Sequence, residues 1–174
     1  MPAKKLLSII IPSNNLASYL EEALDSLIKE KSIGKYVEIC ISDNSNSAET
    51  YEMYKNKYSS SKIIKYKRSL KSPSLDENAF EVSKMANGKY IWFFGDDDLL
   101  IKDSLNKILN FLEDKNPSLV IFNSKSFDTN GQIQERRVPI NENIFFKLED
   151  NDKFLSMMGG YITYIPSILI DKNL

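Results

Sequence analysis

The segment Leu6 to Ile11 is a short apolar run that ends at Pro12. Such a run is typical of a β-strand buried on both faces, as in a parallel sheet covered by helices. Comparable runs recur along the chain and predict further strands at Tyr36 to Ser42, Ile63 to Tyr66, Tyr90 to Phe94 and Leu119 to Phe122.

Apolar residues recur at helical spacing between these runs. They predict helices over Leu16 to Ile28, Ala48 to Tyr58 and Leu75 to Ala86, and a further helix that is marked by Leu105 to Leu112 and stops before Pro117. Gly88 follows the third of these helices and is the predicted residue that ends it. Strands that alternate with helices in this way indicate an α/β fold, with a mainly parallel sheet flanked by helices.

The regular pattern covers residues 1–125 and weakens over residues 126–174. We therefore expect an α/β core followed by a second region. In that region we predict a turn at Asp128 to Gly131, an extended arm at Ile133 to Pro139, a helix at Asp152 to Met158 and an apolar stretch at Tyr161 to Ile170. We find no closing element after that stretch, and our interpretation is that the fold continues beyond this sequence.

Composition excludes several kinds of chemistry. The chain has no histidine and a single cysteine, Cys40, so histidine-assisted catalysis and a zinc site are not expected. We expect Cys40 to be a packing residue in the second strand. The 23 basic and 24 acidic residues give a net charge of −1, which does not favour a nucleic-acid partner. No apolar run is long enough to span a membrane.

The apolar strand that ends at Phe94 runs into Gly95 and then into Asp96-Asp97-Asp98. Two carboxylates about 4 Å apart repel by roughly 4 kcal/mol at an effective dielectric constant of 20. A divalent cation that also binds a diphosphate would offset this repulsion. The ligands would be oxygen atoms, which suits magnesium, manganese or calcium. In the alternative interpretation the loop is solvated, and Asp98 or Asp103 caps the next helix.

Other motifs fit less well. An EF-hand that began at Asp96 would need glycine and glutamate where Ile101 and Lys107 stand. The first strand is followed by Pro12-Ser13-Asn14-Asn15, with neither a dinucleotide-binding glycine pattern nor a phosphate-binding loop.

Polar residues follow three of the predicted strands, namely Ser13-Asn14-Asn15, Asp43-Asn44-Ser45 and Asp96-Asp97-Asp98. The carboxyl ends of parallel strands meet at one edge of a sheet, and ligands bind beyond that edge. We therefore expect the three clusters to converge there and to supply the acceptors for a nucleotide.

Three blocks together resemble family 2 glycosyltransferases of the GT-A fold. They are Ser8 to Asn15, Glu38 to Ser45 and Gly88 to Asp98. Their order and spacing match that family over roughly the first 125 residues. The resemblance implies a nucleotide-sugar-binding core in residues 1–125 and the start of an acceptor-side region in residues 126–174.

The resemblance also implies roles for individual residues. It places Pro12, Ser13 and Asn15 beside the nucleoside and Asp43 on the base. It places Asp76 and Asn78 in a segment over the nucleotide, Asp96 near the ribose, and Asp97 and Asp98 at the metal, Mn²⁺ or Mg²⁺, in a DXD motif. Asp43 could instead be a turn residue, Asp76 and Asn78 could be helix-cap residues, and Asp98 could orient the loop.

The chain departs from the family pattern at Asn14, Gly95 and Lys102, where the family usually has an aromatic residue, an aspartate and a proline. The carboxylate that serves as the catalytic base in inverting members lies well downstream of the matched blocks. Asp128, Glu135 and Asp171 are the remaining carboxylates that could be nominated for this role, and none lies in a recognisable motif. The catalytic base is therefore unknown.

The resemblance implies that a sugar moves, with inversion, from a nucleoside-diphosphate sugar to a glycan or glycolipid acceptor. It further implies surface-polysaccharide or lipid-linked oligosaccharide synthesis in the cytoplasm, with peripheral membrane association and oligomeric state left open. The alternative is a truncated module that binds the nucleotide sugar without transferring it. A nucleotidyltransferase is disfavoured, because Ser13 to Ser18 contains no glycine-rich basic stretch.

Overall fold

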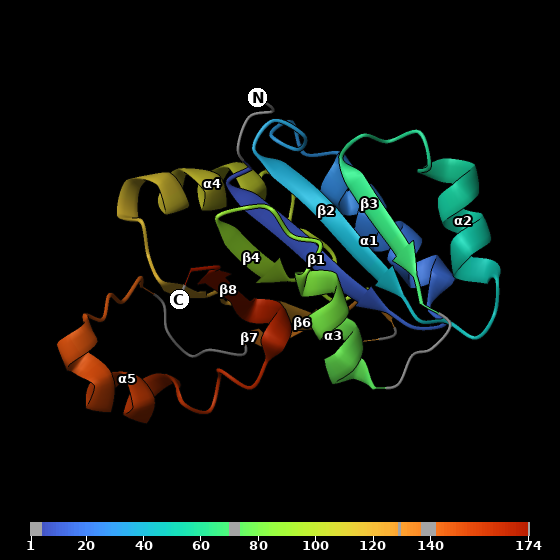
Figure 1. Cartoon of the computed structure of the whole chain (residues 1–174). Coiled ribbons are helices and arrows are strands. Elements are labelled where there is room, and N and C mark those ends of the chain that lie inside the picture. The colour runs from blue at the N-terminus through green and yellow to red at the C-terminus, as the bar shows by residue number, and fades with distance from the viewer. Residues whose placement is uncertain (1–4, 70–73, 129, 137–141, 174) are drawn as a thin grey trace.

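The computed structural model describes residues 5–69, 74–128, 130–136 and 142–173 (Figure 1). Its strands are β1 (Leu7–Ser13), β2 (Val37–Asp43), β3 (Ile64–Arg68), β4 (Tyr90–Phe93), β5 (Leu119–Ile121), β6 (Lys125–Phe127), β7 (Ile133–Arg136) and β8 (Ile168–Asp171). Its α-helices are α1 (Ala17–Ile28), α2 (Glu49–Lys57), α3 (Leu75–Ser83), α4 (Ser104–Lys115) and α5 (Asn151–Met158).

The main sheet has six strands in the order β3-β2-β1-β4-β8-β5. The neighbouring pairs β3-β2, β2-β1 and β1-β4 are parallel, whereas β8 is antiparallel to both β4 and β5. The predicted α/β class with a mainly parallel sheet is therefore confirmed. Strands β6 and β7 form a separate two-stranded sheet, and residues 137–139 of the predicted extended arm lie outside the described residues.

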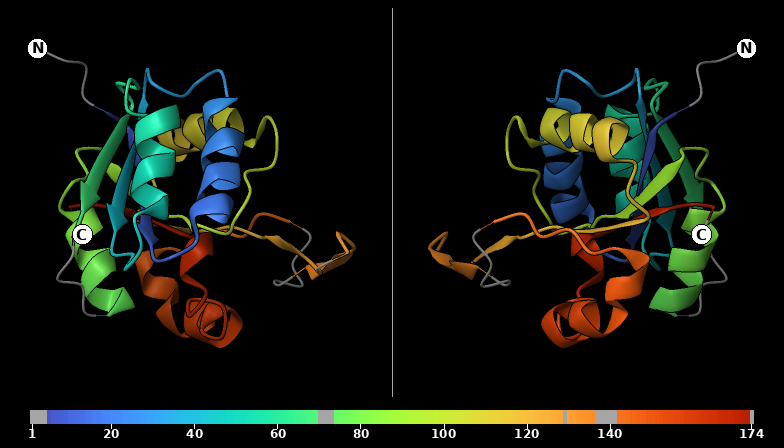
Figure 2. Two further views of the ribbon diagram at one scale, coloured as in Figure 1. Left: turned by 90° about the vertical axis from the view of Figure 1, so that its right-hand side faces the viewer. Right: turned by 90° about the vertical axis from the view of Figure 1, so that its left-hand side faces the viewer.

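Helices cover both faces of the sheet, as Figure 2 shows, with α1, α2 and α4 on one face and α3 on the other. Alternate side chains of β1 divide between the two faces. Leu7, Ile9 and Ile11 join the larger core beneath α1 and α4, whereas Ile10 packs with Val82 of α3. The continuous apolar run therefore reflects burial on both faces, as the sequence predicts.

Cys40 of β2 is fully buried in the smaller core beside α3. Burial raises the pKa of its thiol to about 12, so the reactive thiolate is scarce at neutral pH. Its predicted packing role is confirmed.

Two predictions about the ends of elements are wrong. Helix α3 ends at Ser83, three residues before the predicted Ala86, and Gly88 does not cap it. A Cβ atom on Gly88 would lie 2.6 Å from the backbone nitrogen of Ser8, so glycine is needed there for close contact with β1. The apolar stretch that ends at Ile170 carried no predicted element, and its last residues form β8, which lies inside the sheet between β4 and β5.

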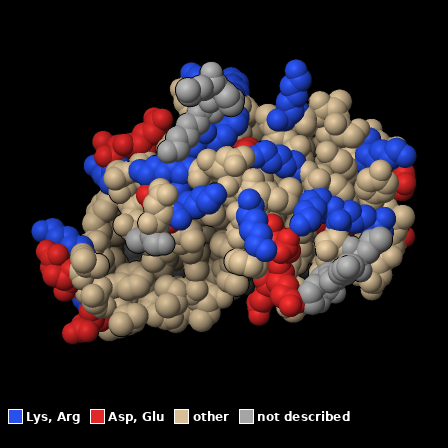
Figure 3. Space-filling model, in the orientation of Figure 1, with Lys and Arg blue, Asp and Glu red and all other residues tan. Residues whose placement is uncertain are grey.

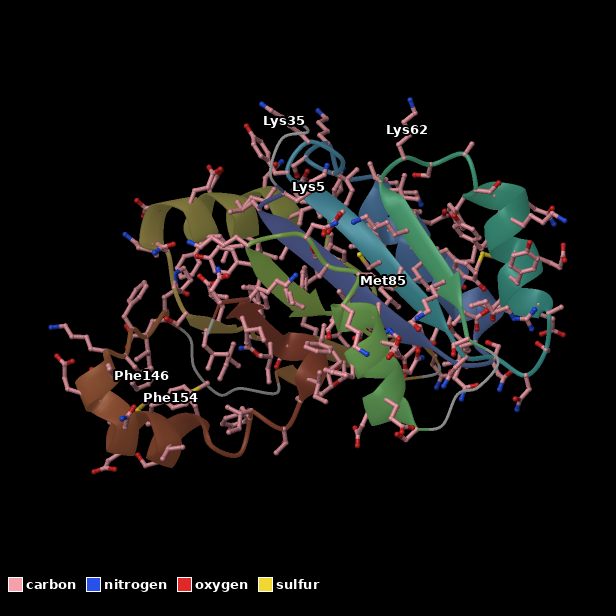
Figure 4. All side chains as sticks on the ribbon, viewed as in Figure 1. Lys5, Lys35, Lys62, Met85, Phe146 and Phe154 are labelled. Carbon is pink, nitrogen blue, oxygen red and sulfur yellow. The ribbon has the colours of Figure 1, made fainter. Side chains whose placement is uncertain are left out.

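The C-terminal helix α5 packs through aromatic contacts with the preceding segment. Phe154 of α5 lies edge-on to Phe146, with 5.3 Å between the ring centroids (Figure 4). Helix α5 begins one residue before the predicted Asp152 and ends at the predicted Met158. None of the helices in the described part of the chain is long and apolar enough to cross a bilayer.

Candidate functional site

The three predicted polar clusters meet at the carboxyl edge of the parallel strands. Ser13 lies opposite Asp43 in the β1-β2 pairing. The backbone N–H of Asn14 donates to the carboxylate of Asp96 at 3.3 Å, and the backbone N–H of Asn15 donates to the hydroxyl of Ser45 at 2.8 Å. The predicted convergence is therefore confirmed.

The loop after β1 is locked to the loop after β2. Asn15 has a left-handed backbone conformation, with φ of 57°, which asparagine tolerates better than most residues. Its side-chain oxygen accepts the backbone N–H of Asn46 at 3.1 Å, and the Ser45 hydroxyl lies 3.1 Å from that of Thr50 in α2. The two loops therefore form one preorganised unit at the edge of the sheet.

Asp43 is the last residue of β2 and is fully buried. One of its oxygens accepts the Ser45 backbone N–H at 2.8 Å, and the other accepts the Tyr66 hydroxyl and lies 4.0 Å from Nε of Arg68. Burial and the hydrogen bond to Asp43 raise the pKa of Tyr66, so this hydroxyl stays a donor at neutral pH. Each carboxylate oxygen has two lone pairs, so Asp43 keeps spare acceptor capacity. Its side chain has no exposed surface, so a ligand would reach it only after the groups that cover it shift.

The aspartates that follow β4 lie in three different environments. Asp96 is partly buried, and burial together with the nearby Asp97 carboxylate raises its pKa, although the Ser13 hydroxyl and the Asn14 N–H act in the opposite direction. Asp97 is exposed. Asp98 accepts the backbone N–H of Gly95 at 3.2 Å and so closes the loop on itself. The repulsion argued from sequence spacing is thus relieved in part by hydrogen bonds from the protein itself.

These carboxylates suit a hard divalent cation that is shared with a ligand. Within the described residues, no group of three or more histidine, cysteine, aspartate or glutamate side chains is arranged to hold a metal. Mg²⁺ usually takes one or two protein carboxylates and completes its shell with water and substrate phosphates. An exposed Asp97 beside the partly buried Asp96 fits that manner of binding, and it does not fit a closed protein cage.

Gly95 provides the space in which the acidic loop folds. A Cβ atom at this position would lie 2.5 Å from a carboxylate oxygen of Asp98 and 2.9 Å from one of Asp97. We therefore expect Gly95→Ala to displace both carboxylates and to weaken metal-dependent nucleotide binding at least tenfold, with a small change in Tm because the loop lies at the surface. Titration calorimetry and thermal unfolding would measure the two quantities, and unchanged affinity would show that this packing is unimportant.

The structure supports only in part the alternative interpretation, in which Asp98 or Asp103 caps the helix that follows the acidic loop. Asp103 occupies the N-cap position of α4, but its side chain forms no capping hydrogen bond. Asp98 accepts a hydrogen bond from the backbone N–H of Gly95.

The remaining predicted residues lie on or near α3. Asp76 is exposed in the first turn of that helix, where acidic side chains gather at its lower end in Figure 3. The helix is capped by Ser74 and Glu77 in a reciprocal pair of hydrogen bonds, so Asp76 and Asn78 are not its cap. Asn78 is buried, and its side-chain amide donates to the backbone carbonyls of Ser42 at 3.0 Å and Ser13 at 3.3 Å.

Sequence reasoning missed the residues that hold Asp43 in place. Tyr66 and Arg68 lie two residues apart on β3, which pairs with β2. The Tyr66 ring stacks on the ring of Tyr54 in α2, with 4.1 Å between the ring centroids. The spacing of Tyr66 and Arg68 shows that they share a face of the sheet. Only the parallel register of β2 and β3 shows that this face meets Asp43.

Comparison with known proteins gives a consistent result. The family model for glycosyl transferase family 2 matches residues 8–167. Abequosyltransferase RfbV from Salmonella typhimurium is 32% identical over 97% of this chain, which spans 53% of the length of RfbV. A poly(ribitol-phosphate) β-glucosyltransferase from Bacillus spizizenii is 28% identical over 72% of this chain, which spans 20% of that protein.

Solved structures share the fold at low sequence identity. S. aureus TarS 1-349 has a TM-score of 0.71 and 19% identity over 95% of this chain, and 47% of the TarS chain is covered. The same TarS fragment in complex with UDP-GlcNAc has a TM-score of 0.70 at 18% identity. A mannosyltransferase from Pyrobaculum calidifontis, in complex with GDP-Man and Mn²⁺, has a TM-score of 0.60 and 17% identity over 69% of this chain and 36% of its own.

The chain thus spans about half the length of RfbV and of the TarS fragment. Its mixed, mainly parallel sheet matches the GT-A architecture of these structures. The family model covers nearly the whole chain. This protein belongs to glycosyl transferase family 2.

Proposed function

We propose that this chain provides the nucleotide-sugar-binding part of a glycosyltransferase. The enzyme would move a sugar, with inversion, from a nucleoside-diphosphate sugar to a glycan or glycolipid acceptor. The observation that carries this proposal is the meeting of the Ser13, Asp43 and Asp96 clusters at the carboxyl edge of the sheet, in a member of this family. Residues 1–125 would bind the donor, and residues 126–174 would begin the acceptor side.

The donor would lie across the locked pair of loops. Pro12, Ser13 and Asn15 would contact the nucleoside, and Asp43 would accept an N–H of the base. Asp96 would lie near the ribose, since its carboxylate is held at the start of the first loop by the Asn14 N–H. Asp76 would belong to the segment over the nucleotide.

We assign the metal, Mn²⁺ or Mg²⁺, chiefly to Asp97. Its carboxylate is exposed at the edge of the sheet, whereas an oxygen of Asp98 is occupied by the Gly95 N–H. Asp98 would then contribute one oxygen or only hold the loop that carries Asp97. A bound divalent cation would neutralise the diphosphate and so stabilise it as the leaving group.

The biological setting is inferred from the relatives. Their printed names are those of an abequosyltransferase and of poly(ribitol-phosphate) glycosyltransferases. We infer a role in surface-polysaccharide or lipid-linked oligosaccharide synthesis, on the cytoplasmic side and at the inner face of the membrane. Since the chain spans 53% of RfbV, a donor-binding module without transfer activity is the second candidate. A product assay on this chain separates the two.

The test is thermal stabilisation by a panel of nucleoside diphosphates and their sugars, with and without manganese. The proposal predicts that at least one of these ligands raises Tm by several degrees, and only when metal is present, because a ligand that binds the native state alone stabilises it. A panel in which no ligand raises Tm would contradict the proposal.

A further inference from the structure

The side chain of Asn78 links the two loops of the donor site from beneath. Asn78 is only 4% exposed. Its amide nitrogen has two hydrogens, which suit its two acceptors, the carbonyls of Ser42 and Ser13. These carbonyls lie at the ends of neighbouring strands. Ser13 is the last paired residue of β1, and Ser42 precedes Asp43, the last paired residue of β2.

This position matters because the sheet ladder stops there. Beyond Ser13 and Asp43 the segments that follow β1 and β2 leave the sheet, and the distance between these two segments is set by local contacts. Ser13 O also accepts the backbone N–H of Asn44 at 3.0 Å, so the Asn78 amide and the second loop share one acceptor. A change at Asn78 would therefore alter the first loop and the second loop together.

Helix α3 fixes where this amide lies. The capping pair of Ser74 and Glu77 sets the start of the helix, and Asn78 follows directly. One turn later Val82 is fully buried against Ile10 and Cys40, which anchors the helix to β1 and β2. The amide is thus held rigidly against the ends of the strands on the α3 face.

We propose that Asn78 is a positioning residue that clamps the loops after β1 and β2 at the spacing the donor requires, without touching the donor itself. This inference rests on the proposed function, because the loops are those assigned to the nucleoside. It replaces the contact with the nucleotide that the family resemblance implies for Asn78. Both hydrogens of its amide are already used by the protein, which leaves that amide nitrogen no donor for a ligand.

The decisive variants are Asn78→Asp and Asn78→Leu, which keep the size of the side chain and remove the two donated hydrogen bonds. The aspartate also places a carboxylate beside two carbonyl oxygens. We expect either variant to weaken the affinity for the nucleoside diphosphate at least tenfold and to raise KM for the donor, while kcat of any transfer stays within about threefold. Titration calorimetry well below Tm measures the first effect.

Val82→Ala is the matched control, because it removes buried contacts from the same helix one turn away from the clamp. It should lower Tm while leaving the affinity for the nucleotide unchanged. If the Asn78 variants bind nucleotide like the wild type, or if Val82→Ala weakens binding equally, the clamp is excluded.

A second readout needs no ligand and separates this inference from the proposed function. Hydrogen exchange in the free protein should quicken at least tenfold at the backbone amides of Asn15 and Asn44 in both Asn78 variants, and not in Val82→Ala. Unchanged exchange at these amides would overturn the clamp even if the donor binds. Failure of the wild type to bind any nucleotide would reject the proposed function and leave the exchange result to decide on the clamp.

Discussion

Replacing Asp97 with asparagine is expected to weaken manganese-dependent binding of the nucleoside diphosphate by about 100-fold or more. The substitution keeps the size of the side chain and removes the charge that would hold the cation next to the diphosphate. Because Asp97 is exposed, the fold should be unaffected and Tm without ligand should stay close to that of the wild type. Titration calorimetry with nucleotide, in manganese and in a chelator, gives the affinity in each state.

Asp103→Asn provides the matched control for charge. Asp103 is also exposed, lies in the same connection between β4 and α4, and forms no capping hydrogen bond. We expect it to bind nucleotide like the wild type. Equal losses in the two variants would mean that general negative charge matters, whereas full binding by Asp97→Asn would show that the metal site is elsewhere.

Replacing Glu38 with glutamine is expected to lower the free energy of unfolding by about 2 to 3 kcal/mol. Glu38 of β2 is 4% exposed. Its carboxylate accepts the Ser8 hydroxyl at 2.7 Å and the Asn87 backbone N–H at 2.6 Å, and it pairs with the Lys65 ammonium at 2.7 Å. Lys65 also donates to the backbone carbonyl of Met85, which is labelled in Figure 4. Urea denaturation at pH 7 measures the loss.

The same residue predicts how stability depends on pH. Burial alone would raise the pKa of Glu38, but the bonds from Lys65, Ser8 and Asn87 outweigh it and hold the pKa below its usual value. The contribution of ionised Glu38 to the free energy of unfolding is therefore complete above the unfolded-state pKa of about 4.3. It is lost as the pH falls through the lower pKa of the folded state.

Glu38→Gln should accordingly flatten the fall in unfolding free energy between about pH 5 and pH 3. Glu81→Gln is the control, because Glu81 pairs with Lys67 and Lys84 at the protein surface, where such pairs contribute little. If Glu81→Gln flattened the curve as much as Glu38→Gln, the buried network would not be the cause.

The main features of the fold could be predicted from sequence because the strands β1, β2 and β4 are rich in apolar residues, are buried on both faces and lie between amphipathic helices. Strand β8 could not, because its four residues pair with β4 and β5, which are distant in the chain, and insert antiparallel between them. The role of Gly88 was also hidden, since it depends on the approach of another strand and not on the helix that precedes it.

The site could be predicted to the level of clusters but not of contacts. Topology alone brings Ser13, Asp43 and Asp96 to one edge. Which atoms each side chain binds depends on register and rotamer, so the amide of Asn78 beneath the strand ends could not be foreseen. The distribution of surface charge could not be predicted from the sequence either. Lysine and arginine side chains from separate segments gather over the strands on the α3 face (Figure 3).

Crystals of this protein soaked with manganese and either uridine or guanosine diphosphate test the donor site most directly. We expect an anomalous difference peak that places a manganese ion within bonding distance of the Asp97 carboxylate and of the diphosphate, with the base beside Asp43. A peak at another place, or a nucleotide bound away from the carboxyl edge of β1, β2 and β4, would contradict the assignment.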